Sequence, residues 1–144
     1  MISLDTNLLV YAHRSRTPEH LKARKAIESA CASRHGCGIA LPSISEFWAV
    51  VTHPECQGKP STPKEAQSFI TNLVEGAGVR IWSPLPDMEY RLLQAAHDLG
   101  IVGPRIFDLQ IAIVSADNGA HQVWTHDSGF ATIHGLKIFD PIHR

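Results

Sequence analysis

The sequence predicts an α/β fold: a mostly parallel central sheet of four to five strands, with helices on both faces in a three-layer α/β/α arrangement. Two observations lead to this prediction. Short apolar runs alternate with longer runs in which apolar residues recur at helical spacing, along almost the whole chain. Turn and helix-start residues separate these runs, and no repeat or linker interrupts their order. We therefore expect residues 1–144 to form a single domain.

The first half of the chain is predicted to begin with a strand, because the apolar run 2–4 ends abruptly in polar residues. A helix is expected from Thr17, which is a suitable cap and is followed by a proline that fits the first turn. Pro42 is expected to end the second strand, so that Ser43 begins the next helix. The predicted elements are strand 2–4, helix 8–12, helix 17–32, strand 38–41 and helix 43–52.

The second half of the chain continues the alternation. Thr62-Pro63-Lys64-Glu65 combines a cap, a helix-initiating proline and a capping-box acid, so a helix is expected to begin there. The predicted elements are helix 62–76, strand 79–82, helix 87–99, a helix from 106 or 108 to 116, strand 122–125 and strand 137–139.

Composition narrows the class of protein. The formal net charge is −1, so no overall basic field indicates a nucleic-acid partner, although residues 13–35 hold six basic residues against two acids. The three cysteines lack CxxC spacing, which favours reduced thiols over a disulfide framework or a cysteine-rich zinc site. The nine histidines show no HxxxH or HExxH spacing. Without a signal peptide or an apolar run of about 20 residues, we expect a cytoplasmic protein that does not enter a membrane.

Four acidic residues stand at unusual positions, three of them directly after predicted strands or close behind them. Asp5 directly follows the first strand, Glu46 lies five residues after the second, and Asp127 lies two residues beyond the fourth. If the sheet is parallel, these three project from its carboxyl edge. Asp108 begins a mostly apolar helix that runs antiparallel to the fourth strand, so topology alone does not fix it at this edge.

Each of these acids also has a purely structural interpretation. Asp5 is suited to an Asx-turn or an N-cap, Asp108 is a suitable helix cap, and Asp127 begins an Asp-Ser-Gly turn. Glu46 completes an S-x-x-E capping box with Ser43. As a set the four are harder to explain in this way, because acids that converge without Lys or Arg partners repel one another. Such clusters persist by binding cations or by raising carboxyl pKa values.

An all-oxygen ligand set favours Mg²⁺ or Mn²⁺ over zinc. One or two such ions support phosphodiester hydrolysis, because they polarise a phosphoryl oxygen and lower the pKa of an attacking water. We expect polar neighbours to hold the carboxylates in place, namely Thr6, Asn7, Ser43 and Thr125.

The positions of these motifs resemble the PIN-domain nuclease pattern, and most closely its VapC-like toxins from type II toxin–antitoxin pairs. The resemblance rests on Asp5-Thr6-Asn7, Ser45-Glu46, Asp108 before Ile111-Ala112, and Thr125-His126-Asp127-x-x-Phe130, and it covers essentially the full chain. It implies an Mg²⁺- or Mn²⁺-dependent endoribonuclease that is inhibited by a cognate antitoxin and is usually dimeric. Asp5, Glu46, Asp108 and Asp127 would form the catalytic and metal-binding quartet, with Thr125 as the supporting hydroxyl.

An RNA substrate would give the basic residues a role in binding phosphates. The candidates are Arg14, Arg16, Arg24, Lys25 and Arg105. The alternative is that they form an ordinary solvated surface.

Two other functions fit the same residues. In a phosphatase or signalling domain Asp5 would be a phosphoacceptor, but no second Asp stands two residues on and no Lys ends a late strand. A non-catalytic RNA- or protein-binding module of the same fold is disfavoured because all four acids are present.

Overall fold

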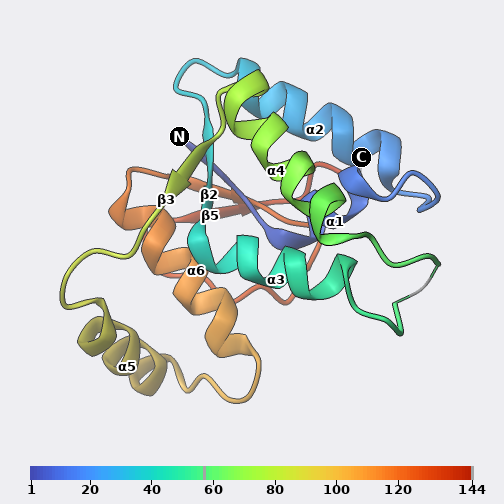
Figure 1. The fold of residues 1–144 in the computed structure, drawn as a ribbon. Helices are drawn as coiled ribbons and strands as arrows, with labels where there is room; N and C mark the ends of the chain where they lie inside the picture. Colours follow the sequence, from blue (N-terminus) through green and yellow to red (C-terminus); the bar gives the residue numbers. More distant parts are fainter. Residues whose placement is uncertain (57, 144) are drawn as a thin grey trace.

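A computed structural model describes residues 1–56 and 58–143 of the chain (Figure 1). Strands and helices alternate as the sequence predicts. The strands are β1 (Ile2–Leu4), β2 (Cys37–Ala40), β3 (Arg80–Trp82), β4 (Gln122–Trp124) and β5 (Lys137–Phe139). The helices are α1 (Thr6–His13), α2 (His20–Ala32), α3 (Leu41–Val51), α4 (Pro63–Ala77), α5 (Met88–Leu99) and α6 (Arg105–Asp117).

The strands form one five-stranded sheet in the order β3-β2-β1-β4-β5, and every neighbouring pair is parallel. β1 is central, with Ser3 in register with Gly38 on β2 and with Val123 on β4. This arrangement confirms the predicted parallel sheet. It also places the residues that follow β1 and β4 side by side at the carboxyl edge.

Helices cover both faces of this sheet, which gives the three layers of Figure 1. Alternation along a strand sends successive side chains to opposite faces. Ile39 packs into the core beneath α1, α2, α3 and α4, whereas the next residue, Ala40, packs into the core beneath α5 and α6. Ser3 likewise faces α6, where its hydroxyl lies 2.7 Å from the Ser115 hydroxyl in a buried hydrogen bond.

Two helix starts show how far local sequence signals predict where a helix begins. The capping box at Thr62 and Glu65 is present, with both reciprocal hydrogen bonds, so that prediction is confirmed. The predicted start of α3 at Ser43 is wrong, because the helix begins at Leu41 directly after β2, with Ala40 at the N-cap position. Pro42 lies in the first turn, where its missing N–H leaves no helical hydrogen bond unmade.

Gly38 on β2 leaves room for the side chain of Trp82 on β3. A Cβ at this position would overlap the indole ring of Trp82, which is 5% exposed. Gly38→Ala is therefore expected to destabilise the fold by ~1–3 kcal/mol, the usual range for overpacking a core. Urea denaturation should detect this loss. Gly76→Ala is the matched control, because that glycine in α4 has open space around it and its replacement should leave stability unchanged or slightly raised. Equal stability of the two variants would contradict the prediction.

The described chain has two further features that bear on the expectations from sequence. Every helix within residues 1–56 and 58–143 is too short or too polar to cross a lipid bilayer. The three cysteines are free thiols, with the Sγ atoms of Cys31 and Cys37 3.4 Å apart.

Candidate active site

Asp5 lies at the junction of β1 and α1, on the carboxyl edge of the sheet. It is the N-cap of α1, and its Oδ1 accepts a hydrogen bond of 2.7 Å from the backbone N–H of Thr6. Its Oδ2 accepts one of 2.7 Å from the hydroxyl of Thr125, which follows β4. Asp5 is only 6% exposed, so an ionised carboxylate there is poorly solvated.

The hydroxyl of Thr125 connects Asp5 to two other polar residues. While it donates to Asp5, it accepts hydrogen bonds from the Asn7 side-chain amide at 3.1 Å and from the Asp127 backbone N–H at 3.0 Å. The Asn7 carbonyl oxygen in turn accepts from the backbone N–H of His126 at 3.2 Å. These bonds attach the segment after β4 to the segment after β1.

Glu46 reaches the same place from α3. The Thr6 hydroxyl donates to its Oε1 at 3.3 Å, so Thr6 touches both Asp5 and Glu46. Because α3 begins at Leu41, Glu46 lies in its second turn and not in a capping box. Burial raises the pKa of Glu46, the Thr6 hydrogen bond opposes the shift, and the charge of Asp108 adds to it.

The pKa of Asp5 shows that three of the acids share one electrostatic neighbourhood. Burial raises this pKa from 3.8 to about 6, against the opposing hydrogen bonds from Thr125 and Thr6. The negative charges of Asp108 and Glu46 contribute to the same rise, after burial as the main cause. A carboxyl in this position gains from any cation that enters the cluster.

Asp108 lies in the first turn of α6, whose N-cap is Pro104. A helix that returns antiparallel to the strand that follows it begins at the carboxyl edge of the sheet. The antiparallel course of α6 therefore brings Asp108 to the other acids, and topology places it better than the sequence suggested. The capping interpretation of Asp108 is wrong, because its side chain accepts instead from Arg105 at 2.9 Å and from the Ala131 backbone N–H at 3.4 Å.

Asp127 joins the cluster through a residue whose pairing the sequence analysis missed. The Arg105 Nη1 atom lies 2.8 Å from Asp127 Oδ2 and 2.9 Å from Asp108 Oδ2, so one guanidinium bridges the two acids. Desolvation alone would raise the pKa of Asp127, but hydrogen bonds from Arg105 and the Gly129 backbone N–H lower it overall. The expectation of acids without a basic partner is therefore wrong for these two.

The i, i+3 spacing of Arg105 and Asp108 was the available signal for this pair, but the helix predicted from 106 or 108 did not include Arg105, whereas α6 begins at it. Gly129 provides room for the pairing, because a Cβ at that position would overlap the guanidinium. The hydrogen bond of 2.9 Å from the Gly129 N–H to Asp127 Oδ1 also confirms that Asp127 begins a turn.

The remaining supporting candidate, Ser43, is on the same side of α3 as Glu46, one turn earlier. Its hydroxyl is buried and finds no hydrogen-bond partner within residues 1–56 and 58–143. Thr6, Asn7 and Thr125 are in the network already described, whereas nothing connects Ser43 to it.

The basic candidates other than Arg105 do not surround the acids. Arg14 follows α1, an eight-residue helix that rises about 12 Å from its start beside Asp5. The Arg14 guanidinium binds the end of α3 and the loop before α4, with hydrogen bonds to the carbonyl oxygens of Val51 at 2.9 Å and Lys59 at 3.1 Å. Arg16 is exposed in the loop before α2, and Arg24 and Lys25 are exposed on α2.

The donor set of the cluster fits a hard divalent cation. Asp5, Glu46, Asp108 and Asp127 offer only carboxylate oxygens, the ligands that Mg²⁺ and Mn²⁺ take in proteins. Two of the four have raised pKa values, and the other two share an arginine. The cluster therefore carries more negative charge than the single arginine neutralises, which favours the binding of a cation.

The chain is similar to known proteins over nearly its whole length. The chain is 27% identical to Ribonuclease VapC43 of Mycobacterium tuberculosis, over 99% of this chain and 96% of the relative. It is 25% identical to Ribonuclease VapC48 of the same organism, over 96% of each chain.

Solved structures share the fold. VapC20 of Mycobacterium tuberculosis, a toxin that cleaves the sarcin–ricin loop, superposes with a TM-score of 0.64 at 14% identity, over 92% of this chain and 98% of that one. VapBC2 from Rickettsia felis, bound to a DNA fragment, gives 0.62 at 19% identity, over 97% and 98%. The family model of the PIN domain matches residues 2–136, and the chain therefore belongs to the PIN domain family.

Proposed function

We propose that this protein is an Mg²⁺- or Mn²⁺-dependent endoribonuclease of the VapC type, the toxin of a toxin–antitoxin pair. The observation that carries the proposal is the convergence of Asp5, Glu46, Asp108 and Asp127 at one edge of a PIN-domain sheet. The named relatives over nearly the full chain are ribonucleases, which supports RNA as the substrate.

The four carboxylates would hold the divalent cation. When bound, it polarises the phosphodiester and lowers the pKa of an attacking water. The other residues act on the carboxylates. Thr6 and Thr125 fix both oxygens of Asp5, while Asn7 fixes Thr125. Arg105 holds Asp108 and Asp127, so its guanidinium would lie beside a phosphate bound at this edge.

The other basic residues extend the proposed RNA contacts beyond the cluster. Arg14, Arg16 and Lys59 line a cleft of about 570 Å³ between the loop before α2 and the loop before α4. Arg24 and Lys25 follow on the exposed side of α2. Phosphate contacts at these positions would bind RNA of any sequence and leave the choice of cleavage site to other residues.

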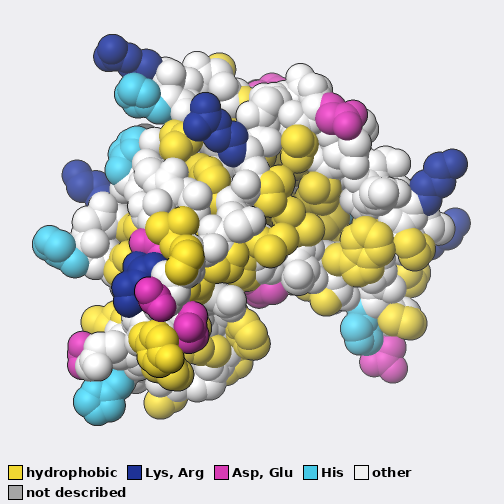
Figure 2. Space-filling model, turned by 60° about the vertical axis from the view of Figure 1, so that its left-hand side comes forward, with side chains coloured by type: hydrophobic (Ala, Val, Ile, Leu, Met, Phe, Trp, Pro, Cys, Tyr) yellow, Lys and Arg dark blue, Asp and Glu magenta, His cyan; other side chains and the backbone are white. Residues whose placement is uncertain are grey.

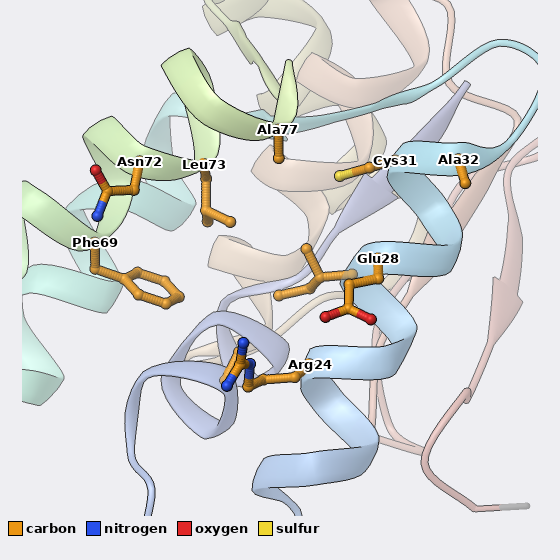
Figure 3. Close-up of a pocket in the computed structure, with 10 residues that line it drawn as sticks. Arg24, Glu28, Cys31, Ala32, Phe69, Asn72, Leu73 and Ala77 are labelled. Atoms are coloured by element: carbon orange, nitrogen blue, oxygen red, sulfur yellow. The ribbon is translucent and has the colours of Figure 1, made fainter.

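An apolar groove between α2 and α4 is our candidate for the antitoxin site. The cavity measures about 620 Å³, and Phe69 and Leu73 point into it from α4 toward Cys31 on α2 (Figure 3). Arg24 and Glu28 lie along its rim on α2. An amphipathic helix of the antitoxin would bury its apolar face here and pair its charges with the rim.

A second apolar surface supports a homodimer. Hydrophobic side chains form a band across one face of the molecule (Figure 2). The exposed apolar residues on α5 and the adjoining segments are Leu85, Tyr90, Leu93, Leu99, Val102 and Phe107. Single exposed apolar residues need no explanation, but several of them on one helix and its adjoining segments favour an association surface. We place the contact between two copies of the chain there.

The proposal is tested on Asp108, which has no capping role to lose. Isothermal titration calorimetry with MnCl₂ and an RNA cleavage assay with and without EDTA would be run on wild type and Asp108→Asn. We expect wild type to bind the ion and to cleave RNA until EDTA is added, and the variant to do neither. Glu89→Gln is the matched control, because Glu89 is an exposed first-turn acid of α5.

Two outcomes would contradict the proposal. Manganese binding that is unchanged in Asp108→Asn would remove the metal site from this edge. Cleavage that continues undiminished in EDTA would remove the metal from the reaction.

A further inference from the structure

A second group of potential metal ligands lies beside the acid cluster, on the far side of the segment that follows β4. His126 is in that segment, Asp140 directly follows β5, and His143 is three residues further along. His126 and Asp140 are half-buried, whereas His143 is exposed. Because the parallel pairing of β4 and β5 aligns their carboxyl ends, residues 14 positions apart in sequence meet here.

The ligand atoms are close enough to share an ion. Nδ1 of His126 lies 2.9 Å and Nδ1 of His143 lies 4.0 Å from the same oxygen, Oδ2 of Asp140. One ligand atom from each residue lies within 4.8 Å of the others. Ligands about 2.0–2.1 Å from a tetrahedral ion stand roughly 3.3–3.4 Å apart, so the exposed His143 ring has only to turn inward.

The side chains of Asp140 and His126 and the backbone that carries His143 are held in place by groups other than a ligand. Oδ1 of Asp140 accepts the backbone N–H groups of Ile142 at 2.9 Å and of His143 at 3.2 Å, which leaves Oδ2 facing the two imidazoles. The Ile142 side chain is buried in the core with α1 and α2, so it anchors the segment that carries His143. The Tyr11 ring meets the His126 ring edge-on at 6.0 Å.

We propose that His126, Asp140 and His143 form a separate site for a zinc-like divalent ion. Two imidazoles and one carboxylate suit zinc and its neighbours in the first transition series, and they leave at least one position for water. The acid cluster contains only oxygen ligands and suits Mg²⁺ or Mn²⁺. The chemistry of the ligands therefore distinguishes the two sites. The proposal of a zinc site does not rest on the proposed RNA cleavage.

An ion at this site would connect the C-terminal segment to the catalytic edge. His126 is the residue between Thr125 and Asp127, and its backbone N–H donates to Asn7. Fixing the His126 side chain to Asp140 and His143 would hold the whole segment in the conformation that positions Thr125 against Asp5. The zinc ion would thus hold the segments of the active site together. None of its three ligands would bind the divalent ion of the acid cluster.

Zinc titration in excess MgCl₂ tests the proposal, with binding followed by calorimetry and by the visible absorption of a Co²⁺-loaded sample. We expect one zinc ion per chain in wild type and an affinity at least ~10-fold weaker in His143→Ala, since even outer-sphere partners of a metal contribute this much. His143 is exposed, so its replacement should leave the fold intact. His97→Ala is the matched control, because His97 forms an exposed pair with Asp98, 3.3 Å apart.

A third variant, Asp5→Asn, tells the two sites apart. It should keep the bound zinc, because Asp5 belongs only to the acid cluster. Zinc binding that is lost in Asp5→Asn but unchanged in His143→Ala would overturn the proposal, as would equal affinities for wild type and His143→Ala. Either result would leave His126 and Asp140 as a simple hydrogen-bonded pair.

Discussion

Asp5→Asn is expected to abolish metal-dependent RNA cleavage and, at the same time, to make the metal-free protein more stable. Neutralising a catalytic carboxylate typically lowers turnover by ~10³–10⁴-fold. The gain in stability has a different cause. Asp5 is buried beside other acids, and its pKa of about 6 means that its ionised form destabilises the fold at neutral pH. The shift corresponds to roughly 3 kcal/mol, and because asparagine replaces one of the two accepting oxygens with an amide donor, a net gain of ~1–3 kcal/mol is expected.

The stability difference between wild type and Asp5→Asn is expected to depend on pH in one direction. The folded pKa of Asp5 is raised from 3.8 to about 6, so the folded protein holds the proton more tightly than the unfolded chain does. Below the unfolded pKa wild type and Asp5→Asn should therefore be similarly stable. As the pH rises through about 6 wild type loses stability relative to the variant, and above that the difference is constant. Urea denaturation in EDTA across this range measures it.

Asp127→Asn is the control with the opposite sign. The pKa of Asp127 is lowered, because hydrogen bonds from Arg105 and Gly129 outweigh its desolvation. Its ionised form stabilises the fold, so the variant should be less stable than wild type at neutral pH and similar to it in acid. A metal-free Asp5→Asn that is no more stable than wild type at neutral pH would contradict the prediction, because it would show that the Asp5 carboxylate is better solvated than its burial in this structure implies.

The comparison of Asp5 with Glu46 shows how far the sequence alone leads. Asp5 was predictable because it directly follows a strand, and ligands bind at the carboxyl ends of the strands in a parallel sheet. The role of Glu46 was obscured by a capping-box pattern that the structure does not use, since α3 begins two residues before Ser43. Nothing in the local sequence distinguishes these two starts, because Pro42 is compatible both with a strand end and with a first helical turn.

Contacts between distant residues account for what the sequence analysis missed. Arg105 was predicted to bind RNA, but its pairing with Asp127 depends on how α6 and the segment after β4 fold together. The group of His126, Asp140 and His143 likewise depends on the register of β4 and β5. Fold class, strand order along the chain and acid identities follow from local patterns, whereas such pairings follow from tertiary packing.

Thr125→Val is expected to have the second-largest effect, since it removes one hydroxyl without changing the shape of the side chain. Thr125 is 1% exposed, and its hydroxyl makes all three hydrogen bonds that join Asp5, Asn7 and Asp127. Valine would leave the Asn7 amide and the Asp127 N–H without this acceptor. Each unsatisfied buried group costs about 1–3 kcal/mol, so a loss of ~2–4 kcal/mol is expected in EDTA.

The same substitution changes the site as well as the fold. The Thr125 hydrogen bond opposes the rise in the pKa of Asp5, so its loss moves that pKa higher. Protons then compete better with the divalent ion, and the acid limb of the cleavage profile shifts to higher pH. We expect cleavage to fall by ~10–100-fold, as for other partners that orient metal ligands.

Thr125→Ser separates this role of the hydroxyl from that of the methyl group. Serine keeps the hydroxyl and loses only packing, so it should retain the wild-type pH profile and metal requirement even if its stability falls. Cleavage assays over a range of Mn²⁺ concentration and pH compare the two variants directly. If Thr125→Val and Thr125→Ser had the same profile, Thr125 would be a packing residue, and the link from β4 to Asp5 would have no part in catalysis.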